Sequence, residues 1–147
     1  MATTNVQIAS FPLEGDLPVY NYSTTTAIAA GQAVMLDVAN PVNNAVPGNY
    51  AIGVTLPASG GNPSICLGIT VDTIPALGTG RVRPGGVATV QCHGAVTIGT
   101  FVEATPTAGK VGRVRTSTAA QPSIGLALTS GIDDDIIPVL VLLNKNA

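Results

Sequence analysis

Charged side chains are scarce in this chain of 147 residues: they make up 10% of it, and the formal net charge is −2. Only two lysines occur, Lys110 and Lys145. A surface that binds nucleic acid uses dense Lys and Arg to neutralise phosphates, so we expect no nucleic-acid partner. Aromatic residues are also few, at 3% with no Trp. This scarcity argues against the aromatic stacking platforms of sugar-binding sites.

Long hydrophobic runs are missing as well. The longest apolar run covers residues 136–143 and includes Pro138, which is far short of the roughly 20 residues that a membrane-spanning helix needs. Residues 1–10 contain no Lys or Arg, whereas a secretory leader begins with a basic region. We therefore expect neither a membrane partner nor a secretory signal.

Cysteine and histidine are too few for the common catalytic and metal-binding sites. Cys66 and Cys92 are not in a C-x-x-C pattern, so no disulfide framework is implied and both could be small core residues. His93 follows Cys92 directly, but neighbours on a strand point to opposite faces, which disfavours a thiolate–imidazole pair. These three residues also fall short of the roughly four ligands of a zinc site. The sequence predicts no catalytic residue, no metal and no cofactor, and a protein that is not an enzyme.

Two further patterns favour turns over ligand sites. Residues 133–135 are three consecutive Asp, which could attract a divalent cation, but they lack the alternating ligands and the closing Glu of an EF-hand loop. Because they follow Gly131 and precede an apolar stretch, they favour a solvated hairpin tip. Residues 78–80 (Gly-Thr-Gly) and 85–86 (Gly-Gly) neither open a helix nor carry the lysine of a phosphate-binding loop, so we interpret them as turns.

The chain is rich in β-branched residues, with 17 Val, 11 Ile and 17 Thr. This composition favours strands over helices, and turn residues separate the apolar stretches at the close spacing of a sandwich or barrel. We therefore predict an all-β fold, a small barrel or sandwich of short strands. The expected strands are 19–28, 32–38, 50–55, 65–72, 81–83, 86–92, 95–98, 100–104, 109–115, 123–129 and 136–143.

Residues 1–22 are predicted to form an extended N-terminal arm that precedes a β-barrel domain at 23–147. Prolines in this segment prevent a helix and favour extended conformations for the residues before them. Phe11 is one of only two phenylalanines. Together with Leu13 it is a candidate anchor for a partner's pocket, although the arm could instead fold back onto its own barrel.

A weak internal repeat relates residues 27–34 to residues 95–102. Each segment contains an apolar residue, then a turn glycine and then an apolar strand. An apolar-Gly-apolar step follows each copy, at 52–54 in the first and 124–126 in the second, and 67–69 is a third such step. Glycine within a strand often marks a bulge or a close backbone approach, so a barrel could bend at these steps. Chance resemblance between short β segments is the alternative.

Four of the six cationic residues fall in two Arg-Val-Arg triplets. Residues two apart on a strand share a face, so each triplet places both arginines on one side. One interpretation is a solvated face or salt bridges to nearby carboxylates. The other is a patch that binds a carboxylate-bearing protein. The candidate partner-binding residues are then Arg81, Arg83, Arg113 and Arg115.

The order of segments from residue 65 to residue 143 resembles the bacteriophage capsid decoration, or cement, proteins of the small β-barrel type. This stretch is a little over half of the chain; residues 27–38 fit more loosely, and residues 1–22 match no motif. The segments that carry the resemblance are 67–69 (Leu-Gly-Ile), 86–90 (Gly-Val-Ala-Thr-Val), 95–102 (Ala-Val-Thr-Ile-Gly-Thr-Phe-Val), 109–111 (Gly-Lys-Val), 124–128 (Ile-Gly-Leu-Ala-Leu) and 139–143 (Val-Leu-Val-Leu-Leu).

The resemblance implies a structural virion protein that binds the outer surface of a phage head, contacts the major capsid protein and stabilises the capsid lattice. It also implies a homotrimer that is assembled in the host cytoplasm. The hydrophobic fraction of 46% favours the trimer as well. A receptor- or carbohydrate-binding β module of a phage tail or fibre is the alternative. A small hydrolase or lyase on a related barrel is disfavoured by the single histidine and the lack of paired carboxylates.

Overall fold

The computed structural model describes residues 15–43, 51–57, 66–118 and 122–145, and every regular element in these ranges is a β-strand. The prediction of an all-β fold is confirmed. The same ranges contain no helix that is long and apolar enough to cross a membrane. The strands are β1 (Leu17–Asn21), β2 (Ala33–Leu36), β3 (Val42–Asn43), β4 (Ala51–Thr55), β5 (Cys66–Thr70), β6 (Gly78–Arg83), β7 (Gly85–Gln91), β8 (Phe101–Ala104), β9 (Val114–Thr116), β10 (Ser123–Ala127) and β11 (Ile136–Lys145).

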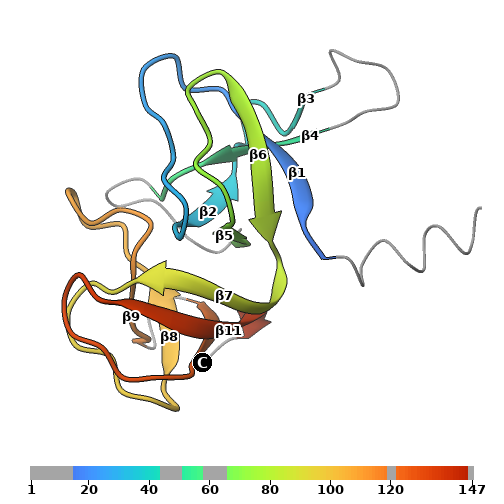
Figure 1. The fold of residues 1–147 in the computed structure, drawn as a ribbon. Coiled ribbons are helices and arrows are strands. Elements are labelled where there is room, and N and C mark those ends of the chain that lie inside the picture. Colours follow the sequence, from blue (N-terminus) through green and yellow to red (C-terminus); the bar gives the residue numbers. More distant parts are fainter. Residues whose placement is uncertain (1–14, 44–50, 58–65, 119–121, 146–147) are drawn as a thin grey trace, which may run out of the picture.

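Strands β1 to β6 form a first barrel, drawn in blue to green in the upper part of Figure 1. Their order is β1-β6-β5-β2-β4-β3, with antiparallel neighbours throughout. In addition, β1 pairs in parallel with β4, for example Val19 with Ile52. This pairing closes β1, β6, β5, β2 and β4 into a ring and leaves β3 outside it, so the ring itself has no free edge.

Strands β7 to β11 form a second barrel, yellow to red in the lower part of Figure 1. Their order is β7-β11-β10-β8-β9, again with antiparallel neighbours. The first and last strands of this order, β7 and β9, approach each other just after β7 ends. There Cys92 forms a parallel bridge with Val114 of β9. The His93 amide then donates to the Val114 carbonyl at 2.7 Å. The prediction of a small barrel is confirmed.

The two barrels match strand for strand: β1, β2, β4, β5 and β6 correspond in order to β7, β8, β9, β10 and β11. The register also matches. Val34 of β2 lies opposite Gly68 of β5, and Val102 of β8 lies opposite Gly125 of β10. The chain therefore repeats one five-stranded unit, and the second unit begins immediately after Pro84.

The predicted repeat of residues 27–34 with residues 95–102 is confirmed. Each segment runs from a loop that holds one isolated bridge, at Ile28 and at Val96, into the corresponding strands β2 and β8. Because the chain reverses direction before β2 and again before β8, each unit needs a turn glycine followed by an apolar strand.

The predicted pairing of the later glycine steps is wrong. Residues 52–54 lie in β4, whereas residues 124–126 lie in β10, whose counterpart is β5 with residues 67–69. A three-residue pattern does not show which strand it belongs to, and the connections that separate these strands differ in length between the two units.

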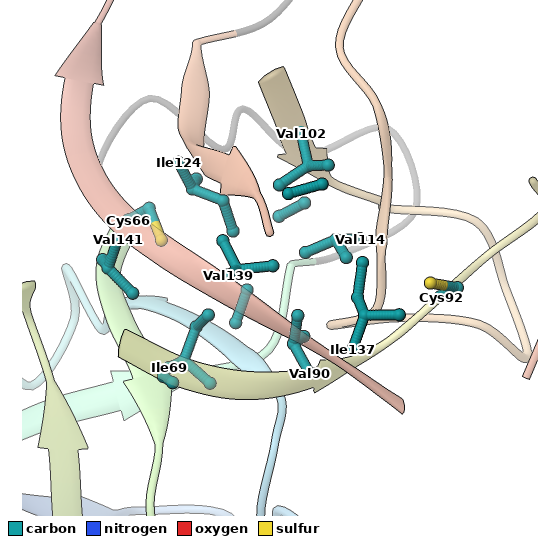
Figure 2. Close-up of a cluster of buried hydrophobic side chains, with 14 of the residues drawn as sticks. Cys66, Ile69, Val90, Cys92, Val102, Val114, Ile124, Ile137, Val139 and Val141 are labelled. Atoms are coloured by element: carbon teal, nitrogen blue, oxygen red, sulfur yellow. The ribbon is translucent and has the colours of Figure 1, made fainter. Parts of the chain in front are cut away.

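Among the described residues, the buried apolar side chains form two clusters, one of which joins the two barrels. The larger cluster fills the second barrel and extends onto the outer face of the first, where Ala33 and Met35 of β2 pack against it. Val34 between them points into the first barrel, as the alternation of a strand requires. Figure 2 shows Cys66 and Ile69 of the first barrel among the side chains of the second. The smaller cluster comprises Val19, Ile28, Val34, Val54, Ile74 and Val82.

Several segments differ from the strands and turns expected from the sequence. Residues 95–98 form a loop and no strand, and residues 42–43 form the short strand β3, which was not among the expected strands. The glycines at 78–80 and 85–86 lie in β6 and β7, so their interpretation as turns is wrong. At Gly80 a Cβ would come within 2.5 Å of the Ile74 side chain, so this glycine serves close packing within a strand.

The predicted arm of residues 1–22 falls only partly within the described ranges. Leu17–Asn21 is β1, which pairs with both β4 and β6 inside the first barrel. Residues 1–14, including Phe11 and Leu13, lie outside the described residues.

Candidate interaction surface

Arg81 and Arg83 of β6 contact carboxylates of their own barrel. Arg81 contacts both oxygens of Asp72, from Nε at 2.8 Å and from Nη2 at 2.9 Å, and this hydrogen bonding lowers the pKa of Asp72. Asp16 lies 3.0 Å from Nε of Arg83 and 3.8 Å from Nη1 of Arg81, so both arginines lie on one side of the strand, as predicted. Arg83 Nη1 also donates to the Val87 carbonyl at 2.9 Å, which links the two barrels.

The aspartates at 133–135 form an exposed turn before β11, which confirms the solvated tip predicted for them. Lys110 Nζ lies 2.8 Å from Asp133 Oδ2 and 3.0 Å from Asp134 Oδ1. Arg113 also contacts Asp134. The hydrogen bonds from Lys110, and that from Arg113 to Asp134, lower the pKa of these two carboxyl groups. The turn is therefore tied to the loop that precedes β9.

Glu103 of β8 is a buried carboxylate that the sequence analysis did not single out. It is 0% exposed, and its Oε1 accepts a hydrogen bond from Arg115 Nε at 2.8 Å. Its Oε2 accepts from the backbone N–H of Thr118 at 3.0 Å. The one signal that could have found it is an acidic residue inside an otherwise apolar strand.

All four arginines of the two triplets thus have a carboxylate partner in the chain. The interpretation as salt bridges is confirmed, because each arginine contacts at least one carboxylate: Arg81 with Asp72, Arg83 with Asp16, Arg113 with Asp134 and Arg115 with Glu103. Their recognition of another protein stays a prediction. Arg81 retains 56% side-chain exposure, so its guanidinium is the most accessible of the four to a partner.

Cys66 and Cys92 are free and buried in the larger cluster, as small core residues would be. Figure 2 places them at opposite ends of that cluster. His93 makes its side-chain contact elsewhere, with Nδ1 at 3.0 Å from Thr105 Oγ1. Within the described part of the chain, no group of three or more His, Cys, Asp and Glu side chains could hold a metal ion.

Both thiols are expected to be unreactive in the folded protein. Burial raises the pKa of Cys66 to about 12, and burial together with the nearby charges of Asp135 and Asp133 raises the pKa of Cys92. Because the thiolate is the reactive form, Ellman's reagent at mildly alkaline pH should label neither cysteine until guanidinium chloride unfolds the chain. Rapid labelling of the native protein would contradict the buried positions.

The outer face of the second barrel carries a row of apolar side chains across four strands. Val87 of β7 lies opposite Leu140 of β11, Leu140 opposite Leu126 of β10, and Leu126 opposite Phe101 of β8. Val87 is 48% exposed and Phe101 is 43% exposed. We call these four residues the outer apolar row. Two residues along the same strands from Val87 and Leu140 lie Thr89 and Pro138. These two residues also lie opposite each other and carry no charge.

Comparison with solved structures gives a likeness in fold. No family model and no curated protein matches the chain. Among solved structures, the crystal structure of the head fiber gp8.5 N base in bacteriophage phi29 aligns with a TM-score of 0.56 and 12% sequence identity. The two proteins share a fold. The alignment covers 86% of this chain and 92% of the phi29 chain, so the shared fold includes both barrels.

Proposed function

We propose that this chain is a structural protein of a phage virion that binds the outer surface of the head, contacts the major capsid protein and stabilises the capsid lattice. The observation that carries the proposal is the fold shared with the N base of a phage head fiber over 86% of the chain. The segments that resemble decoration proteins favour the same location. In this proposal the chain is no enzyme, and it joins the head in the host cytoplasm as a homotrimer.

The described residues suit a rigid bound module. The closed ring of the first barrel leaves little free strand edge for uncontrolled pairing, and a shared core fixes the two barrels to each other. A module that binds only the assembled shell stabilises it by mass action, and the repeated sites of a lattice add avidity. A deep ligand pocket is not needed for this role.

The residues that contact the partner are assigned within this proposal to two places. Phe11 and Leu13 anchor the N-terminal arm, and the exposed guanidinium of Arg81, together with Arg83, Arg113 and Arg115, binds carboxylates. Fixing an arm costs about 1–2 kcal/mol of backbone entropy per residue. A partner surface must therefore bury Phe11 or pair with the backbone of the arm in order to hold it.

Binding to undecorated heads of the phage that encodes the chain tests the proposal. The purified full chain should co-sediment with the heads to a saturable level and raise the temperature at which they release DNA. A variant that lacks residues 1–14 keeps β1, so it should fold with a similar melting temperature but reach lower occupancy. Failure of the full chain to co-sediment contradicts attachment to the head. Co-sedimentation without thermal protection contradicts stabilisation of the lattice.

A receptor- or carbohydrate-binding module of a phage fibre is the second candidate, because the matched structure is the base of a fiber. Tyr20 and Tyr22, whose ring centroids lie 4.7 Å apart, are the aromatic pair in the described residues that could contact a sugar. Saturable binding of the full chain to one class of glycan on an array, lost in Tyr20→Ala, would favour this candidate over the first.

A further inference from the structure

We propose that the outer apolar row of the second barrel binds a second copy of this chain. The inference rests on the homotrimer of the proposed function and deepens it by naming the face through which copies meet. The row consists of Val87, Leu140, Leu126 and Phe101, directly paired across β7, β11, β10 and β8.

The internal repeat shows what covers this face in the other unit. Ala33 of β2 lies opposite Ile69 of β5, and these residues correspond to Phe101 and Leu126 of the second barrel. Ala33 and Ile69 are both 0% exposed, because the second barrel packs against them as part of the larger cluster. The same face of the same unit is thus already a barrel-to-barrel interface inside the chain.

The outer face of the second barrel is more apolar than the exposed part of the corresponding face of the first barrel. In the first barrel, the position that corresponds to Leu140 is Arg83, which is partly exposed and paired with Asp16. In the second barrel the corresponding neighbours are Leu140 and Val87, so an ion pair is replaced by two apolar side chains. Loss of charge and gain of an aromatic residue are typical of the buried centre of an interface.

A second copy is the occupant that the repeat favours. The surface that covers the face within the chain belongs to a barrel of the same fold, and every further copy of the chain brings such a barrel. If two copies pack as the two barrels of one chain do, the contact joins different surfaces of the two copies, head to tail. Head-to-tail contacts produce a ring when the last copy contacts the first. A ring of three accounts for the proposed trimer.

Three lysine substitutions in the full chain test this inference. Val87→Lys and Phe101→Lys place a charge in the outer apolar row. Val38→Lys is the matched control, because Val38 is 73% exposed and lies in the bend that follows β2, outside the row. Light scattering should give three times 14.7 kDa for the native chain and for Val38→Lys, and 14.7 kDa for the other two variants. Circular dichroism and the melting temperature establish that each variant is folded.

Two results overturn the inference. If Val87→Lys and Phe101→Lys remain trimeric, the copies meet through another face. If the native chain is monomeric at tens of micromolar, no copy occupies the row. In the monomeric case, loss of head binding in Val87→Lys alone would assign the face to a capsid subunit, so the proposed attachment to the head would stand while this inference fails.

Discussion

Replacing Arg115 with alanine is expected to lower the free energy of unfolding by about 3 kcal/mol, toward the low end of the range for breaking a buried ion pair. Glu103 is 0% exposed, while the Arg115 side chain keeps 32% of its exposure, so water already reduces part of the effect. Removing the guanidinium leaves a carboxylate inside the protein without a cation. Since small domains have about 5–15 kcal/mol of stability in total, urea unfolding followed by circular dichroism should detect the loss easily.

The internal repeat supplies a compensating variant for this experiment. Glu103 pairs with Arg115 where the first barrel pairs Met35 with Thr55. The double variant Glu103→Met with Arg115→Thr copies that neutral pair, so it should lose less stability than Arg115→Ala alone. Arg81→Ala, which breaks the exposed pair with Asp72, is the control and should change stability little. Equal losses in Arg115→Ala and Arg81→Ala would contradict the structural importance of the buried pair.

Alanine at Gly68 is expected to destabilise the protein by about 3 kcal/mol or more, because a backbone clash and an unfavourable dihedral act together. A Cβ at Gly68 would lie 2.2 Å from the Arg83 carbonyl oxygen, and the φ angle of +141° is rare for residues with a side chain. At Gly125, the counterpart in β10, an added Cβ would lie 2.5 Å from the Leu140 carbonyl oxygen, but the φ angle is not positive. Gly125→Ala should therefore cost less than Gly68→Ala.

Gly85→Ala is the matched control for the glycine pair. It lies in β7, and a Cβ there would meet no atom within 4 Å, so we expect no loss of stability. The three variants can be compared by urea unfolding under the same conditions. A Gly125→Ala protein as stable as Gly85→Ala would contradict the close approach of β10 and β11 at Gly125.

Local chemistry explains why some features could be predicted from the sequence. The excess of Val, Ile and Thr predicted strands because a branched Cβ acts on its own backbone, whatever the partner. The repeat of residues 27–34 with residues 95–102 was visible because both segments include the turn glycine as well as the strand. The exposed aspartates at 133–135 follow from the same local preference for turns.

Contacts between distant segments could not be predicted in this way. The pairing of Glu103 with Arg115 depends on the register of β8 with β9. Gly68 likewise lies against the Arg83 carbonyl, which belongs to a different strand, β6. The apolar side chains of the outer row also look like ordinary core residues in the sequence. Only the packing of the two barrels shows which of them are buried and which are left uncovered.

The sequence by itself determined the β class, the small-barrel scale and the first segment of the repeat, because composition, turn residues and strand alternation act over a few neighbouring residues. The tertiary structure alone decided that the chain forms two matching barrels, that all four arginines pair internally, and that one outer face is covered in the first barrel and open in the second. These features follow from strand order and register, which join residues far apart in the chain and are fixed only when both barrels pack together.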